Sequence, residues 1–101
     1  MLAEFTIFPV GEGTSLSKYV ARAIDLVEKS GLNHKVGPMG TAVEGSWDQI
    51  MGLMKKCHDA VAQDSDRVVM HIYVDDRKGA KDCLTCKIES VEKRLGHPVK
   101  K

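Results

Sequence analysis

The chain has 101 residues, and its 15 Lys and Arg residues against 14 Asp and Glu residues leave a net charge of +1. At this length folding buries roughly two-thirds of the unfolded chain's surface, so we expect a single domain over residues 1–101 and exclude a two-domain enzyme. Acidic and basic residues are interspersed and create no field for phosphate backbones or an anionic bilayer, so we expect neither a nucleic-acid nor a membrane partner.

The N-terminal part of the chain predicts a strand followed by a helix. Residues Leu2 to Val10 are rich in aromatic and β-branched types at both odd and even positions, which is typical of a central strand. From Leu16 to Val27 apolar residues recur at helical spacing. Thr14 or Ser15 is the candidate N-cap of this helix, and Gly31 is its stop signal.

A bent pair of short strands and a second helix follow. From His34 to Gly45 short apolar and polar residues alternate, and Gly37-Pro38 interrupts them, which predicts a small hairpin or a kinked strand. The next four residues have the spacing of a capping box, a reciprocal pair of hydrogen bonds at a helix start. These four residues are Ser46-Trp47-Asp48-Gln49. An apolar stripe after them predicts the second helix, and it consists of Ile50, Leu53, Met54, Cys57 and Val61.

The last third of the chain predicts a strand and a third helix. Residues Val68 to Val74 are apolar on both faces of a strand, and a charged loop follows from Asp75 to Asp82. Helical spacing returns after this loop, and the helix ends near Gly96 and Pro98. The apolar stripe of this helix consists of Leu84, Ile88, Val91 and Leu95.

This order of elements predicts an α+β fold of the ferredoxin-like, split βαβ type, an antiparallel sheet with its helices on one face. Strand alternation then leaves the other face, here called the open face, without a helix layer. Such an apolar face predicts association with a second copy as a homodimer or homotetramer. Its expected residues are Leu2, Glu4, Thr6 and Phe8 from the first strand and Val69, His71 and Tyr73 from the last, while Val68, Met70, Ile72 and Val74 should pack on the helices.

The cysteines and glycines do not predict a cofactor or metal site. Cys83 and Cys86 have the spacing of a redox pair or half a zinc site, but Cys57 and His58 point about 100° apart on a helix and would not complete it. Gly11-x-Gly13 lacks the third glycine of a dinucleotide fingerprint. The first turn of the following helix, with Ser15 and Ser17, would still suit a polar or anionic ligand group.

No arrangement of residues predicts catalysis. Ser15, Ser17 and Thr41 have no identifiable His and acid partner, so nucleophilic catalysis has no support. His71 lies in mid-strand, where a packed or interface histidine is more common than a general base. We therefore expect a protein that is not an enzyme.

Four other residues point to binding, each with an ordinary structural alternative. Glu44 lies between Val43 and Gly45, where a carboxylate either meets a cation or donors, or protects an exposed strand edge. Trp47 is either a packing anchor or a stacking platform. Arg77 and Lys87 form either a local anion site or ordinary solvated surface.

The sequence favours a cytoplasmic protein. Its first residues lack the basic and apolar pattern of a secretion signal, and no segment approaches the ~20 apolar residues of a membrane span. Three cysteines are an odd number for a secreted disulfide framework, so we expect reduced thiols.

Three segments together resemble the small thiamine-binding protein family, the single-domain relatives of the YkoF-like proteins. They are PVGEGTSLSKYVA at 9–21, GPMGTAVEG at 37–45, and Asp75-Asp76-Arg77 leading to KIESV at 87–91. The resemblance implies a ferredoxin-like cytoplasmic homo-oligomer whose sheets meet face to face. It also implies binding, without turnover, of thiamine or its hydroxymethylpyrimidine moiety.

A thiamine-like ligand offers an aminopyrimidine that needs hydrogen-bond partners and a permanent thiazolium cation that needs aromatic or acidic surroundings. Under this resemblance Glu44 would serve either group, and Thr41 and Ser17 would complete the hydrogen bonds. Gly40 and Gly45 would let the ring approach the backbone. The full expected site comprises Ser15, Ser17, Gly40, Thr41, Glu44 and Trp47.

Two alternatives to a thiamine-binding protein remain open. Arg77 with Lys87 would favour a small anionic, phosphorylated metabolite. The same chain could instead serve as a structural or regulatory oligomerisation module that binds no small molecule.

Overall fold

The computed structural model describes residues 1–11, 13, 16–79 and 83–100. In chain order these residues form β1 (Leu2–Pro9), α1 (Ser17–Lys29), β2 (Asn33–Val36), β3 (Thr41–Glu44), α2 (Trp47–Ala62), β4 (Val68–Asp75) and α3 (Cys83–Leu95). The strands form one sheet in the order β2-β3-β1-β4, antiparallel at every pairing. This confirms the predicted α+β, ferredoxin-like fold.

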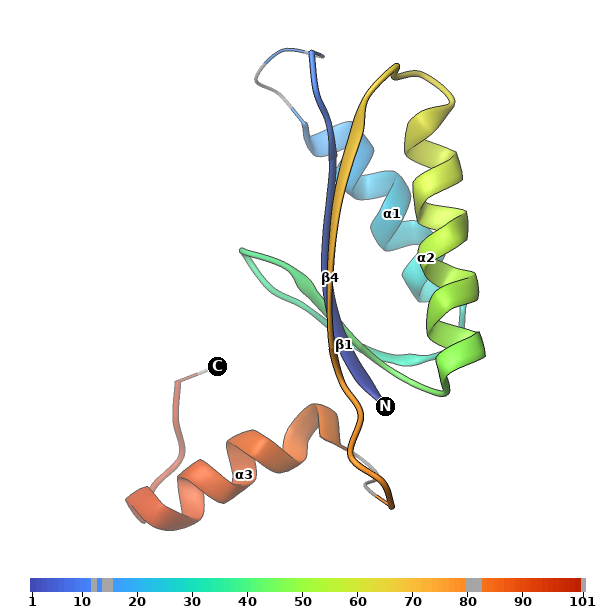
Figure 1. Ribbon diagram of the computed structural model, residues 1–101. Helices are drawn as coiled ribbons and strands as arrows, with labels where there is room; N and C mark the ends of the chain where they lie inside the picture. Colours follow the sequence, from blue (N-terminus) through green and yellow to red (C-terminus); the bar gives the residue numbers. More distant parts are fainter. Residues whose placement is uncertain (12, 14–15, 80–82, 101) are drawn as a thin grey trace.

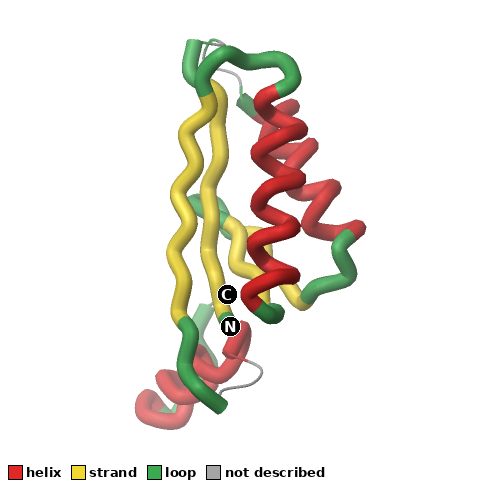
Figure 2. Tube along the Cα trace, turned by 45° about the vertical axis from the view of Figure 1, so that its right-hand side comes forward, coloured by secondary structure: helices red, strands yellow, loops and turns green. Residues whose placement is uncertain are grey.

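β1 is the central strand, and its residues alternate between two environments. Ala3, Phe5 and Ile7 are buried toward α1 and α2, the helices that cover one face of the sheet (Figures 1 and 2). The even-numbered residues of β1 lie on the open face, where Thr6 pairs with His71 and Phe8 with Val69. The two predicted faces of the sheet are therefore confirmed by the register.

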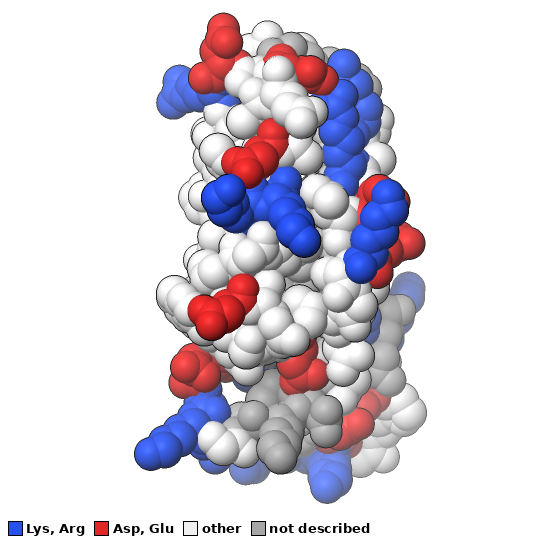
Figure 3. Space-filling view, turned by 90° about the vertical axis from the view of Figure 1, so that its right-hand side faces the viewer, with Lys and Arg blue, Asp and Glu red and all other residues white. Residues whose placement is uncertain are grey.

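α1 and α2 close the core over this sheet. The core residues contributed by the two helices are Tyr19, Ala23 and Val27 from α1 and Ile50, Leu53, Met54, Cys57 and Val61 from α2. On the outer side of these helices charges of both signs alternate, as Figure 3 shows for the face turned to the viewer. Among the described residues, no helix is both long and apolar enough to cross a membrane.

The helix ends follow the sequence signals at α2 but not at α1. Ser46 Oγ accepts from the backbone N–H of Gln49 at 3.2 Å, and Gln49 Oε1 accepts from the backbone N–H of Ser46 at 2.9 Å, so the predicted capping box is confirmed. The N-cap of α1 is Leu16, which makes no side-chain cap bond. The prediction of Thr14 or Ser15 as the cap is wrong because the helix begins later, and both residues lie outside the described part of the chain.

α3 departs from the prediction that the helices share one face. It contacts β3 and β2, and Figure 1 shows it beyond the end of the sheet, on the side away from α1 and α2. The other two helices already cover the core face of the sheet. β4 ends at Asp75, and Asp75 forms an ion pair with Lys87 of α3. The predicted apolar stripe of α3 is consequently only partly buried, because Val91 and Leu95 are each 51% exposed.

We predict that Ser46→Ala destabilises the protein by about 1 kcal/mol because the substitution removes the acceptor of the capping box. For a domain of about 100 residues this lowers the thermal midpoint by roughly 4–8 °C. Circular dichroism during heating measures the change. Ser17→Ala is the matched control, since Ser17 also begins a helix but is exposed and is not a cap. An equal loss in both variants would contradict the capping argument.

Candidate functional site

A cavity of about 270 Å³ lies between α1, β1 and the turn that joins β2 to β3. Phe5 and Ile7 of β1 line it, Val20 and Ile24 of α1 lie across from them, and Met39 of the turn also lines it. None of its lining residues carries a formal charge. Ligand pockets span about 300–1,000 Å³ and are mostly apolar with few polar groups. The cavity is slightly smaller than this range and therefore suits a small group without charge.

Thr41 supplies a polar side chain in this apolar wall. It begins β3, pairs with Phe5 of β1 and is only 5% exposed. Its hydroxyl can donate one hydrogen bond and accept two. Thr41 is the buried polar residue found in the described part of the chain, and it is one of the residues that line the cavity.

Gly40 keeps the turn close to β1. A Cβ at this position would lie 3.1 Å from Glu4 Cγ and 3.3 Å from the carbonyl oxygen of Phe5. Gly37 closes the same turn by donating its backbone N–H to the carbonyl of Gly40 at 2.9 Å. The glycine signal in the sequence therefore reflects a close approach between two parts of the backbone, and this approach forms one wall of the cavity.

The structure does not bring Glu44 to Thr41. Thr41 faces the helices, whereas Glu44 pairs with Leu2 and Asn33 on the open face. Glu44 Oε1 accepts a weak bond from Asn33 Nδ2 at 3.5 Å, and Glu44 lines a separate hollow beside Cys86 and other residues of α3. Residues three positions apart on a strand point to opposite faces, so this separation was already encoded in the spacing.

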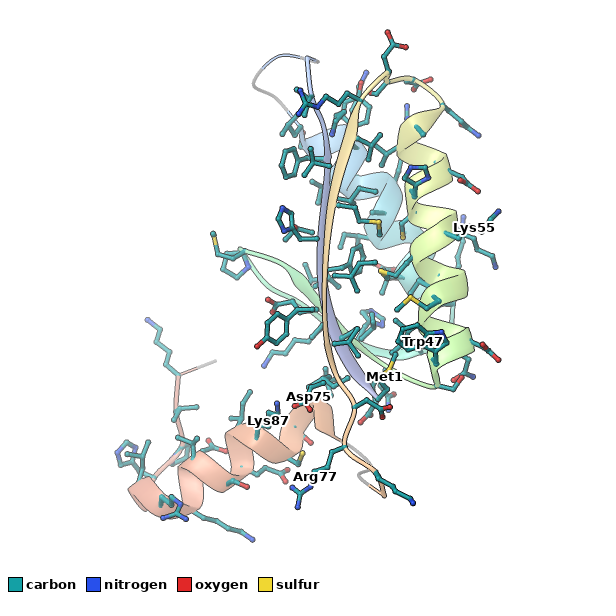
Figure 4. All side chains as sticks on the ribbon, viewed as in Figure 1. Met1, Trp47, Lys55, Asp75, Arg77 and Lys87 are labelled. Carbon is teal, nitrogen blue, oxygen red and sulfur yellow. The ribbon has the colours of Figure 1, made fainter. Side chains whose placement is uncertain are left out.

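The remaining expected ligand residues lie outside the cavity. Trp47 is the first residue of α2 and is 59% exposed, and Figure 4 shows it at the end of α2 where the sheet begins at Met1. Ser17 is exposed at the first residue of α1. Ser15 lies outside the described residues.

Arg77 and Lys87 are brought together, but around a carboxylate. Lys87 Nζ donates to Asp75 Oδ2, and the two residues line a small hollow of about 120 Å³ with Arg77 and Ser90 (Figure 4). The hydrogen bond from Lys87 lowers the pKa of the Asp75 carboxyl, and the charges of Lys87 and Arg77 act in the same direction. An incoming anion would therefore compete with Asp75 for both cations.

Cys57 is a core thiol, as predicted. It is fully buried, its Sγ lies 3.8 Å from the carbonyl oxygen of Ala23, and burial raises the pKa of the thiol to about 11. A protonated buried thiol is unreactive. Cys86 is a half-buried free thiol. Within the described ranges, no three His, Cys, Asp or Glu residues are grouped so that they could hold a metal ion.

Sequence reasoning missed the apolar residues that make the cavity. Val20 and Met39 are 44% and 84% exposed, so neither belongs to the core, yet both line the cavity. Two signals were present in the sequence. The apolar arc of α1 extends past the buried positions to Val20 and Ile24, and an apolar Met39 stands in a turn where a polar residue is usual.

The fold and this cavity define a small α+β domain of the ferredoxin-like class that can hold a small molecule between its sheet and α1. The chain belongs to the thiamine-binding protein family, whose model matches residues 3–92. This match confirms the resemblance found in the three sequence segments.

Relatives and solved structures agree with that assignment. A UPF0045 protein of Methanothermobacter thermautotrophicus is 40% identical over 92% of this chain and 97% of its own length. A hypothetical protein from Methanocaldococcus jannaschii has a similar solved structure, with a TM-score of 0.83, 38% identity and coverage of 89% of this chain and 93% of its own. A solved Thermotoga maritima structure, named as a candidate thiamine biosynthesis or salvage protein, has a TM-score of 0.78, 26% identity and coverage of 89% and 96%.

We predict that Lys87→Met raises the pKa of Asp75 toward its ordinary value of 3.8, because the variant removes the main hydrogen-bond donor. Arg77→Gln should raise the pKa less, since Arg77 acts only through its charge. Because the pKa of Asp75 is lowered in the folded protein, its ionised carboxylate adds to the free energy of unfolding above pH 3.8. This contribution is lost as the pH falls through the lower pKa of the folded state. Carboxyl carbon NMR during an acid titration measures the pKa in each variant. A larger shift in Arg77→Gln than in Lys87→Met would contradict this assignment.

Proposed function

We propose that this protein is a non-catalytic, cytoplasmic binding protein for thiamine or its hydroxymethylpyrimidine moiety, acting as a homo-oligomer. The cavity beside Thr41 carries this proposal because it is a partly open, mostly apolar space with a buried threonine in its wall. Membership of the thiamine-binding protein family supports the ligand class. The name of the Thermotoga maritima neighbour supports the same chemistry.

The cavity's lack of charge favours the pyrimidine end of the ligand. A thiazolium cation buried there would lose its hydration and meet no carboxylate, which is costly. An aminopyrimidine is flat and neutral and can exchange hydrogen bonds with the Thr41 hydroxyl. The proposed pose therefore places the pyrimidine beside Thr41 and leaves the thiazolium toward solvent.

This pose changes the role expected for Glu44. The expected hydrogen bonds from Glu44 to the aminopyrimidine are replaced by those of Thr41, since the Glu44 side chain lies on the opposite face of the sheet. Ser17 and Trp47 have no contact with the ligand in this pose. Gly40 acts by holding the turn close to β1.

The proposed homo-oligomer uses the open face. Phe8 and Val69 are only half-buried there, and Tyr73 is 78% exposed. A second copy would cover these side chains and remove their apolar surface from water. Tyr73 also carries a hydroxyl, which suits an interface that is partly wet.

Specific observations also support two other functions. The uncovered open face and the exposed Val91 and Leu95 of α3 favour an oligomerisation module that binds no ligand. The pair of cations at Arg77 and Lys87 favours a small phosphorylated metabolite that displaces Asp75. Both are distinguished from the proposed function by the experiment below.

We predict that thiamine and hydroxymethylpyrimidine each raise the thermal midpoint in a saturable way. One-site binding at 100 times the dissociation constant adds about 2.7 kcal/mol, or about ten degrees or more for a domain of this size. Thr41→Val should abolish the rise, because it keeps the shape of the side chain and removes only the hydroxyl. Differential scanning fluorimetry at fixed protein concentration measures the midpoint.

Glu44→Gln is the matched control for this experiment, because Glu44 lies on the same strand but on the opposite face. It should keep the full response. Loss of response in Glu44→Gln alone would move the ligand to the open face. No response of the unmodified protein at millimolar thiamine would rule out thiamine, and a response to inorganic phosphate instead would favour the site at Arg77 and Lys87.

A further inference from the structure

A second hollow, here called the α1–α2 hollow, lies between the two helices that cover the sheet. Its volume is about 320 Å³, which falls within the range of small-molecule pockets. The last turn of α1 and the residues just after it line one side, and the N-terminal part of α2 lines the other. The hollow shares no lining residue with the cavity beside Thr41, so the two are separate places on the molecule.

The base of the α1–α2 hollow is apolar. Leu53 of α2 is a core residue that is 4% exposed, and it lines the hollow. Leu26 of α1 and Leu32, just after α1, are half-buried against the core and line it as well. A ring placed on these three side chains would lose contact with water, which favours binding. The base of the hollow therefore suits a ligand with an apolar body.

Gly52 lines the hollow from the interior of α2, where glycine is unfavourable. Glycine loses more conformational freedom than alanine when a helix forms, so it destabilises the middle of a helix. A Cβ at position 52 would meet nothing within 4 Å, apart from the helix's own backbone and the two chain neighbours. Gly52 is also not among the glycines with positive φ. Neither packing nor backbone conformation requires this glycine, and its missing side chain lets a ligand approach the α2 backbone closely.

Lys56 supplies a positive charge at one end of the hollow. It follows Gly52 by four residues and therefore lies on the same face of α2. In the described part of the chain Lys56 takes part in no ion pair, whereas Lys29 Nζ of α1 lies 2.7 Å from Asp25 Oδ2. Asp48, the acidic residue in the described lining, precedes Lys56 by about 12 Å along the helix axis. These charges favour an anionic group at the Lys56 end of the hollow.

We propose that the α1–α2 hollow binds a small anionic molecule. Its apolar ring lies on the three leucines beside Gly52, and its carboxylate or phosphate group pairs with Lys56. Both groups offer several acceptor oxygens to the ammonium group of a lysine. A thiazolium cation would instead be repelled by Lys56, so this ligand differs from the one proposed for the cavity beside Thr41. The inference therefore does not depend on the proposed function.

The first test titrates the isotope-labelled full chain with benzoate and with phenyl phosphate while amide NMR signals are recorded. We expect saturable shifts at the amides of Ser30, Gly52 and Leu53, and the stronger of the two probes tells a carboxylate ligand from a phosphate ligand. Benzyl alcohol has the ring without the charge, and inorganic phosphate has the charge without the ring. Each should bind about tenfold more weakly than the ring anions. An absence of saturable shifts with both ring anions would overturn the proposal.

The second test compares two lysine variants. Lys56→Met removes the charge and keeps an unbranched apolar side chain, so it should weaken binding of the ring anions about tenfold. Lys55→Met is the matched control and should bind like the unmodified protein. Lys55 does not line the hollow, its Nζ lies 3.3 Å from Asp59 Oδ2, and Figure 4 shows it projecting from the outer side of α2. Equal weakening in both variants would mean that general surface charge attracts the anion, and the proposal would fail.

The third test is Gly52→Ala. Without ligand this variant should have a thermal midpoint a few degrees higher, because alanine favours the helix and the added methyl group meets no packed atom. The same methyl group should weaken binding of the ring anions several-fold, because it occupies the place of closest approach. A rise in the midpoint also shows that the variant is folded. Unchanged binding in Gly52→Ala would overturn the proposal.

The response to thiamine separates this inference from the proposed function. None of the three substituted residues lines the cavity beside Thr41, so each variant should keep the thiamine response of the unmodified protein. If the unmodified protein binds the ring anions but gives no thiamine response, the proposed function fails and the anion site stands. If the thiamine response falls together with anion binding in Lys56→Met, the two sites are not separate and this proposal fails.

Discussion

The alternation of side chains along β1 is the constraint on which the rest of the structure depends. β1 pairs with β3 on one side and β4 on the other, so its register fixes both. Its odd residues build the core under α1 and α2, and its even residues form the open face. A slip of one position would exchange these two sets and bury Glu4 in place of Phe5. The cost of such an exchange makes the register unambiguous.

The cavity follows directly from this register. Phe5 lies on the helix face, and the pairing of Phe5 with Thr41 sets the threonine on the same side. The turn before Thr41 can then reach α1, because Gly40 lets it lie close to β1. Thr41 and the apolar wall therefore line one space, while Glu44 lies on the other face of the sheet. Residues of β1 thus line a cavity without charged residues, and the charged groups of Asp75 and Lys87 lie at the end of the sheet.

Charged groups of β4 and α3 gather where the sheet ends. Asp75 joins Lys87 there and holds the third helix away from the core face. Val91 and Leu95 of α3 are therefore each 51% exposed, and Tyr73 on the open face is 78% exposed. The described residues thus leave apolar side chains exposed on several surfaces of a single copy.

Local signals were sufficient for much of this protein. The spacing from Ser46 to Gln49 determines a capping box, because both hydrogen bonds join residues three positions apart. Gly31 and Gly96, both with positive φ, mark helix ends for an equally local reason. The apolar pattern of the two long strands also determined which of their residues share a face, and the opposite directions of Thr41 and Glu44 could have been derived from their spacing.

Only the tertiary structure decided the position of α3 and the existence of the cavity. α3 follows a charged loop and has an apolar stripe that would suit either side of the sheet, so its place depends on which face α1 and α2 have already filled. The cavity joins Val20 of α1 to Met39 of a turn, residues that no sequence periodicity relates. Sequence by itself determined the elements and their faces, because those depend on neighbours within a few residues. The site required the fold, because its walls come from segments that meet only when the sheet closes against α1.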